Sequence, residues 1–148
     1  MSNSDQQAVR AVIERRCAAV TGGDSDKSMA DVDENVVMFD LVDPLQHVGK
    51  ASAVARAKTW HASFESSPTL ETCDVEVFMG EDVAFSHFLS HVTGIQKTGQ
   101  KVDMWFRTTL GFARKNGRWW IVHEHGSVPL NPQSGQVSLS LQPQQESS

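Results

Sequence analysis

The sequence contains no tyrosine, few cysteines and no long apolar run. Its two cysteines, Cys17 and Cys73, provide no disulfide framework, which is typical of a reducing compartment. No segment approaches the roughly 20 apolar residues of a membrane span, and the polar N-terminal residues lack the apolar stretch of a signal peptide. These absences predict a cytoplasmic protein that has no contact with a membrane.

Positive charge is also scarce. The 13 Lys and Arg residues are outnumbered by 18 Asp and Glu residues, and the formal net charge is −5. This balance, without a basic cluster, argues against nucleic acid and anionic membranes as partners. The chain also has no glycine-rich phosphate loop and no G-x-S-x-G motif, so we expect no cofactor and no serine nucleophile.

The chain is long enough for one domain with a substantial core. A chain of this length buries roughly 68–70% of the surface that it exposes when unfolded. Its 39% apolar and 21% charged residues are typical of a globular protein. From Pro129 onward, however, Pro, Gln, Ser and Gly dominate. The sequence therefore predicts a folded domain over residues 1–130 and a disordered polar tail over residues 131–148.

Hydrophobic periodicity predicts helices first and strands afterwards. Apolar residues recur at helical spacing from Val9 to Val20, and further helices are expected over 24–33 and 50–66. β-Branched and alternating segments predict strands over 35–41, 46–48, 70–79, 83–93, 101–113 and 118–127. The fold class is therefore α+β, with three helices packed on a curved antiparallel sheet. Such a sheet forms a cone, whose open end is the expected pocket.

Three short motifs carry a family resemblance. They are Gly117–Trp119 followed by IVHEHGSVP over 121–129, GEDVA over 80–84, and Phe39–Asp40 with Gly49 nine residues later. The first two resemble the association domain of calcium/calmodulin-dependent protein kinase II. The third is similar to the first strand of the nuclear transport factor 2-like superfamily, which includes SnoaL-like cyclases and ketosteroid isomerases. The resemblance spans about residues 5–129 and implies the cone-shaped, cystatin-like fold.

The departures from these families limit what the resemblance implies. The pocket arginines of the association domain match Ser90, Leu110 and Gly126 here, so an anionic ligand held by arginines is not implied. The base of ketosteroid isomerase matches Asp40. That enzyme also uses a tyrosine and a protonated aspartate as oxyanion donors. This chain has no tyrosine, and Thr108 stands near the second position, which argues against steroid isomerisation.

Asp40 is the predicted catalytic base. It ends an apolar segment, and no Lys or Arg lies within residues 35–48. Burial should therefore raise the pKa of its carboxyl group and make it a base near neutral pH. The expected polar partner is Glu124 or Thr108. The alternative role for Asp40 is a cap on the turn at Asp43–Pro44.

Strand register decides which face of the sheet lines the pocket. The register of the association domain points one alternating set of side chains inward: Phe88, Ser90, Thr108, Leu110, Val122, Glu124 and Gly126. We expect this set to contact the ligand, together with Trp60 at the pocket mouth. The alternative for Trp60 is a place in the core. In a looser match to ketosteroid isomerase, His87 and His91 point inward instead.

The outer face of the sheet then carries several histidines and a tryptophan. Its residues are His87, His91, Trp105, Arg107, Thr109, His123 and His125. His123 and His125 share a face and, with His87 or His91, have the ligand types of a metal site. The association domain has the same H-x-H pair and is not a metal enzyme, so we predict no metal. An exposed face of this kind predicts a homodimer.

Two hypotheses about function remain open. In the first, the protein binds a small, mostly apolar organic molecule and acts on it as a cofactor-independent isomerase, cyclase or dehydratase, with Asp40 as the base. In the second, it is a non-catalytic ligand-binding or dimerisation module. The missing oxyanion donors favour the second hypothesis, and Asp40 favours the first.

Overall fold

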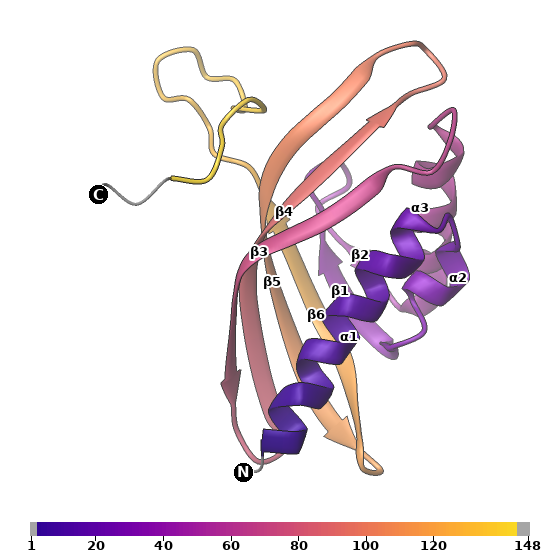
Figure 1. Ribbon diagram of the computed structural model, residues 1–148, viewed down its shortest axis with the longest axis vertical. Coiled ribbons are helices and arrows are strands. Elements are labelled where there is room, and N and C mark those ends of the chain that lie inside the picture. Colours follow the sequence, from indigo (N-terminus) through magenta and orange to yellow (C-terminus); the bar gives the residue numbers. More distant parts are fainter. Residues whose placement is uncertain (1–2, 145–148) are drawn as a thin grey trace.

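Six strands form one curved sheet that helices cover on a single face (Figure 1). The computed structural model describes residues 3–144. The elements are α1 (Asn3–Thr21), α2 (Ser25–Ser28), β1 (Val32–Phe39), β2 (His47–Val48), α3 (Lys50–Ala62), β3 (Thr69–Met79), β4 (Val83–Ile95), β5 (Lys101–Lys115) and β6 (Arg118–Ser127). The strand order is β2-β1-β6-β5-β4-β3, in which only the β1–β6 pair is parallel. The predicted α+β class is confirmed.

The second helix is much shorter than predicted, with four residues. Asp31 falls within the expected helix but lies just before β1. Its backbone oxygen accepts a hydrogen bond from the Ile121 N–H at 2.8 Å, and its carboxylate accepts hydrogen bonds from Arg15 and Arg118. Contacts with α1 and β6 therefore override the local helical tendency here.

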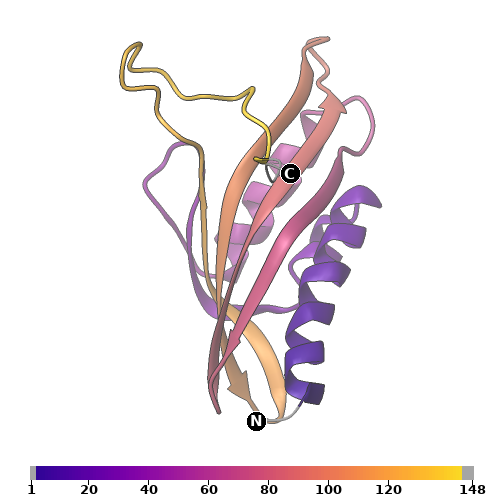
Figure 2. The ribbon, with the colours of Figure 1, turned by 60° about the vertical axis from the view of Figure 1, so that its left-hand side comes forward.

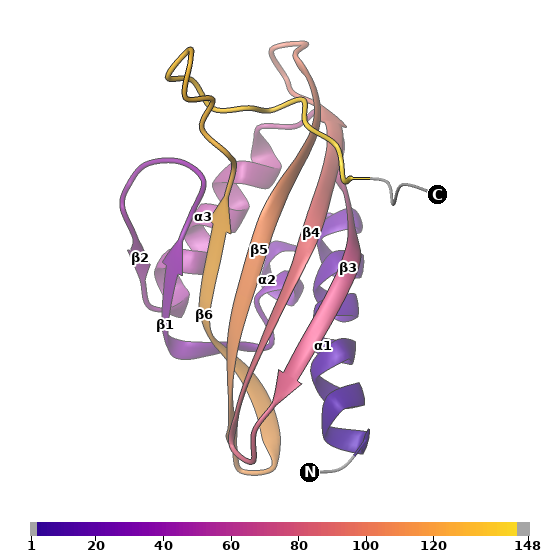
Figure 3. The ribbon, with the colours of Figure 1, turned by 90° about the vertical axis from the view of Figure 1, so that its left-hand side faces the viewer.

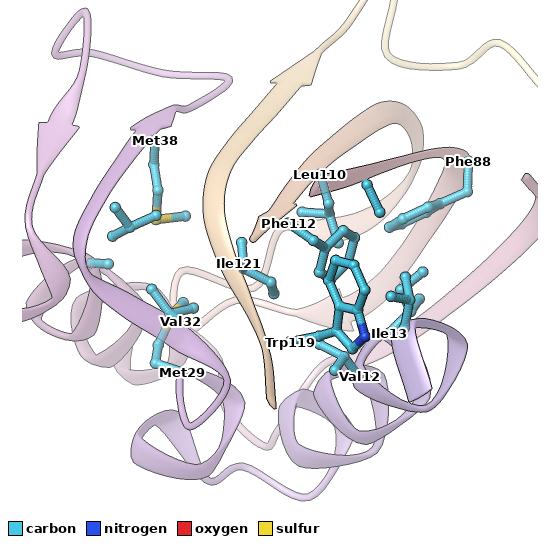
Figure 4. Packing of buried hydrophobic residues seen from close by; sticks show 14 of the residues in the cluster. Val12, Ile13, Met29, Val32, Met38, Phe88, Leu110, Phe112, Trp119 and Ile121 are labelled. Atoms are coloured by element: carbon cyan, nitrogen blue, oxygen red, sulfur yellow. The ribbon is translucent and has the colours of Figure 1, made fainter. Parts of the chain in front are cut away.

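The core lies between the helices and the concave face of the sheet (Figure 4). Val12 and Ile13 of α1 are at most 3% exposed, as their helical spacing predicted, and in Figure 4 they face side chains from β4, β5 and β6. The sheet residues of this part of the cluster include Phe88, Leu110, Phe112, Trp119 and Ile121. A second part of the same cluster joins Met38 of β1 to Ala53 and Ala57 of α3.

A β-bulge in β6 changes the predicted inward set. Phe112 pairs with Ile121 and Gly111 pairs with His123, so Val122 is the extra residue on β6. A Cβ added to Gly111, which lies between the inward Leu110 and Phe112, would be 4.0 Å from Val122 Cγ2. The prediction that Val122 points inward is therefore wrong, because the bulge breaks the alternation at this residue.

Among residues 3–144, no helix lies over the convex face of the sheet (Figures 2 and 3). The chain that follows β6 turns back on this side and crosses above the ends of β5 and β4 in Figure 3. Within residues 3–144, no helix is long and apolar enough to cross a membrane. Residues 145–148, the end of the predicted polar tail, lie outside the described residues.

Candidate functional site

A cavity of about 490 Å³ lies between α3 and the connection from β1 to β2. The connection provides Asp40, Val42 and Asp43, and the first residue of β2 provides His47. The helix and its C-terminal cap provide Ser52, Ala55, Arg56, Thr59, Trp60 and Ser63. Most of these α3 residues are three or four positions apart, so they lie along one side of the helix. The cavity is thus lined by the segment from Asp40 to His47 on one side and by one face of α3, which includes Trp60, on the other.

The phase of β1 directs Asp40 into this cavity. Val36 and Met38 are buried on the helix side of β1, and Asp40 continues the alternation just after the strand ends. Its side chain is only 7% exposed. The same alternation leaves Phe39 on the convex side, where its ring lies 5.3 Å from that of His125. The sequence prediction that Asp40 points inward agrees with this placement.

Arg56 holds the Asp40 carboxylate in a two-pronged ion pair. Arg56 Nε donates to Asp40 Oδ2 at 2.5 Å, and Arg56 Nη2 donates to Oδ1 at 3.0 Å. The backbone N–H of Leu41 also donates to Oδ1, at 2.7 Å. The sequence places no cation within residues 35–48, but in the structure Arg56 of α3 opposes the charge of Asp40. The cation-free environment predicted for Asp40 is thereby corrected. Sequence reasoning missed Arg56, although it precedes Trp60 by one helical turn.

His47 and Trp60 complete the polar and apolar sides of the cavity. His47 Nε2 lies 4.0 Å from Asp40 Oδ2, and its Nδ1 lies 3.3 Å from Ser52 Oγ. The guanidinium carbon of Arg56 lies 5.6 Å from the centre of the Trp60 ring. The carboxylates of Asp40 and Asp43, one guanidinium and one imidazole therefore line a space that an indole ring also borders. Such a set can bind a polar group on an apolar molecule and can move a proton.

The other predicted site residues lie apart from this cavity, beneath α1. Glu124 pairs with Arg16 of α1, with Arg16 Nη1 2.6 Å from Glu124 Oε1 and Arg16 Nη2 donating to Oε2 at 2.8 Å. The hydroxyls of Ser90 and Thr108 are hydrogen-bonded at 2.8 Å. The predicted inward orientation is correct for these three residues, and Phe88 and Leu110 pack in the core. Their contact with a ligand stays a prediction.

Gly126 and Cys17 are two further residues on the helix side of the sheet or on α1. A Cβ added to Gly126 would lie 3.3 Å from Leu41 Cδ2, so Gly126 packs against the chain that follows Asp40. Cys17, next to Arg16 on α1, is free, and burial raises the pKa of its thiol. A thiol in this state is a poor nucleophile. Chemistry on the helix side of the sheet therefore depends on carboxylates, imidazole and guanidinium groups.

The histidines of the convex face take part in local contacts. His91 Nε2 lies 2.7 Å from Asp103 Oδ1, and its ring stacks on Trp105 with ring centres 4.4 Å apart. His123 Nδ1 lies 2.6 Å from the backbone oxygen of Val37. Arg107 donates to the hydroxyl of Ser127 rather than to His125. Within residues 3–144, no three His, Cys, Asp or Glu side chains are grouped as metal ligands would be.

Comparison with known proteins agrees with the fold. The model of the SnoaL-like domain matches residues 9–131, and the chain belongs to this family. An NTF2-like protein of unknown function from Pseudomonas putida is 26% identical, with a TM-score of 0.87 over 97% of this chain and 99% of that one. No curated protein matches the chain significantly.

Two more distant solved structures share the fold. One, from Xanthomonas campestris, is described as a candidate calcium/calmodulin-dependent protein kinase II association domain. It is 20% identical, with a TM-score of 0.70 over 80% of this chain and 84% of that one. The other, from Streptomyces avermitilis, is described as a candidate dehydratase of the NTF2-like family. It is 17% identical, with a TM-score of 0.74 over 85% of this chain and 97% of that one.

Proposed function

We propose that this protein binds a small, mostly apolar organic molecule in the cavity between α3 and the β1–β2 connection, and transfers a proton on it. The observation that carries the proposal is the meeting of Asp40, Arg56 and His47 beside Trp60 in one cavity of about 490 Å³. The reaction class is isomerisation, cyclisation or dehydration. The description of the Streptomyces avermitilis protein as a candidate dehydratase supports this class.

The proton transfer needs no redox partner. Asp40 Oδ2 accepts a proton from a carbon beside a carbonyl group, and the electron pair of the broken C–H bond moves to the carbonyl oxygen. The negative charge that develops there needs a donor, and Arg56 provides the cation that this site offers in place of a tyrosine. His47, 4.0 Å from Asp40 Oδ2, can pass the proton on to another atom of the substrate. In an isomerisation or cyclisation the proton returns to another atom of the substrate, and in a dehydration it leaves with the hydroxyl group as water, so atoms and charge balance.

The ion pair of Asp40 also supports the second hypothesis, a non-catalytic binding protein. Both oxygens of the carboxylate accept hydrogen bonds from Arg56, and one accepts a third from the Leu41 N–H. A base must share or break these bonds before it takes a proton. In a binding protein, the same fork would simply hold Arg56 toward a polar group of the ligand.

Exchange of carbon-bound hydrogen separates the two hypotheses without knowledge of the natural substrate. The probe is α-tetralone, an apolar bicyclic ketone whose protons beside the carbonyl exchange with D2O, followed by proton NMR. We expect the protein to accelerate exchange and Asp40→Asn to reduce this acceleration by about 10²–10⁴-fold, as is typical for loss of a general base. Asp43→Asn is the matched control, because Asp43 lines the same cavity.

Ligand-observed NMR on the same ketone gives the second readout. Binding that Trp60→Ala weakens, combined with exchange no faster than in buffer, would leave the binding module as the function. Absence of binding to wild-type protein would remove the cavity as the site of an apolar ligand of this size.

We further propose a homodimer through the convex face of the sheet and a cytoplasmic location. The free cysteines Cys17 and Cys73 support a reducing compartment. Uncovered aromatic side chains support the dimer, since Phe78 and Phe85 are 46% and 47% exposed and stack with ring centres 4.6 Å apart. We expect a dimer in light scattering at micromolar concentration. A monomer there would contradict the dimer.

A further inference from the structure

The segment after β6 has an internal structure of its own. The backbone N–H of Asn131 donates to the Gln136 oxygen at 2.8 Å, and that of Ser138 donates to the Pro129 oxygen at 2.8 Å. The side chain of Asn131 accepts hydrogen bonds from the backbone of Gln133 and Ser134. These bonds close a loop over residues 129–138, and the chain then continues without regular structure to residue 144. We call residues 129–141 the C-terminal arm.

The end of the arm alternates apolar and serine residues, which is typical of an extended segment with one buried side. Val137, Leu139 and Leu141 alternate with Ser138 and Ser140. In the single chain, however, the three apolar side chains are 53%, 48% and 52% exposed. In Figure 1 the arm stands on the convex side of the sheet. The chain itself thus leaves about half of each of these side chains uncovered.

A solved structure aligns with this chain beyond the end of the family model. The SnoaL-like family model ends at residue 131, and an alignment that ended there would cover at most about 89% of the chain (131/148). The Pseudomonas putida structure nevertheless matches 97% of this chain and 99% of its own, with a TM-score of 0.87. The aligned span therefore includes residues of the arm.

The convex face of the sheet is the second uncovered apolar surface, and it lies on the same side as the arm (Figure 3). It exposes Phe39, Phe78 and Phe85, which are 37%, 46% and 47% exposed. In a two-fold dimer, the arm of each copy can pack on the convex face of the other. The dimer then buries both arms and both convex faces. A second copy of this chain thus accounts for both surfaces at once.

We propose that the C-terminal arm embraces a second copy of this chain, with Val137, Leu139 and Leu141 packed on the convex face of the partner's sheet. This inference rests on the dimer proposed above and names the element that holds it together. It also replaces the predicted disordered tail with an arm that becomes buried on association.

Sedimentation equilibrium of the full chain tests the arm. We expect Leu139→Ser combined with Leu141→Ser to raise the dimer dissociation constant at least tenfold, because each arm loses two apolar contacts. The matched control, Ser138→Ala with Ser140→Ala, changes the alternate positions and should leave the constant within about twofold. Leu139, Ser140 and Leu141 are exposed and Ser138 is half-buried, and none lies in the core, so both variants should fold.

The outcomes separate the arm from the dimer itself. A wild-type dimer whose dissociation constant is unchanged in the double serine variant would overturn the role of the arm and leave the sheet-face dimer standing. A wild-type monomer at 100 μM would overturn both.

Mixed dimers of labelled and unlabelled protein show where the arm packs. We expect isotope-filtered NMR to detect contacts from the methyl groups of Leu139 and Leu141 of one copy to aromatic rings of the other. Contacts only within one copy would mean that the arm folds onto its own sheet, and the proposal would be wrong.

Discussion

Two arginine–carboxylate forks lie on the helix side of the sheet, and they differ in what surrounds them. Arg16 and Glu124 lie beneath α1, with side chains 14% and 16% exposed. Arg56 and Asp40 lie beneath α3, with side chains 27% and 7% exposed, and both line the cavity. Both ion pairs are two-pronged, with Arg16 using Nη1 and Nη2 and Arg56 using Nε and Nη2. The second pair lines the cavity of about 490 Å³, whereas Arg16 and Glu124 are not among its lining residues. Access to the cavity, rather than the type of ion pair, therefore distinguishes the candidate site from a structural contact.

The largest expected effect comes from breaking the fork beneath α1. Glu124→Gln leaves the Arg16 guanidinium in a mostly buried place without a counter-charge, and we expect a loss of about 3 kcal/mol in the free energy of unfolding. The loss should be measured by urea unfolding, because guanidinium chloride would screen the charges. Arg16→Met combined with Glu124→Leu removes both charges and should recover most of the loss.

Asp40→Asn is the comparison variant for stability. It should cost about 1–2 kcal/mol, since Arg56 can turn toward water in the cavity once its partner is neutral. If Asp40→Asn were as destabilising as Glu124→Gln, the cavity would not reach the ion pair, and the difference drawn between the two forks would be wrong.

Local patterns predicted the strands, and the resemblance to the association domain chose between their two faces. Its register placed Phe88, Ser90, Thr108 and Leu110 on the helix side, and the structure buries all four. The bulge at Val122 was not predicted. A bulge is defined by the pairing of β6 with β5, and the sequence of β6 alone does not indicate it. The sequence thus determines the faces of single strands better than the points where two strands slip.

The ion pairs could not be predicted from the sequence for a different reason. Arg56 and Asp40 are 16 residues apart, and Arg16 and Glu124 are 108 residues apart. Nothing in the local sequence connects members of such pairs. The residues near Asp40, 35–48, contain no Lys or Arg, and Arg56 lies outside them. The helical spacing of Arg56 and Trp60 was the one available signal, because both had to lie on the same side of the third helix.

A third arginine–carboxylate group, with more solvent around its cations, sharpens the comparison. The Asp31 side chain is 11% exposed, whereas Arg15 and Arg118 are 57% and 50% exposed. Burial alone would raise the pKa of the Asp31 carboxyl group. The hydrogen bonds from Arg15 and Arg118 outweigh burial and hold this pKa below its ordinary value. This group should therefore contribute less to stability than the fork beneath α1, and its contribution should depend on pH.

Asp31→Asn measures that contribution. The folded state holds the Asp31 carboxylate more strongly than the unfolded state does, so the unfolded state binds more protons as the pH falls. The stabilisation is fully present above the unfolded pKa of about 3.9 and is lost as the pH falls through the lower folded value. We expect urea unfolding at pH 7 to show Asp31→Asn less stable by about 1.5–2 kcal/mol, and the gap to wild type to narrow steadily below about pH 4. A gap that stays constant down to pH 3 would mean that the shape of Asp31, and not its charge, stabilises the junction of α1, α2 and β6.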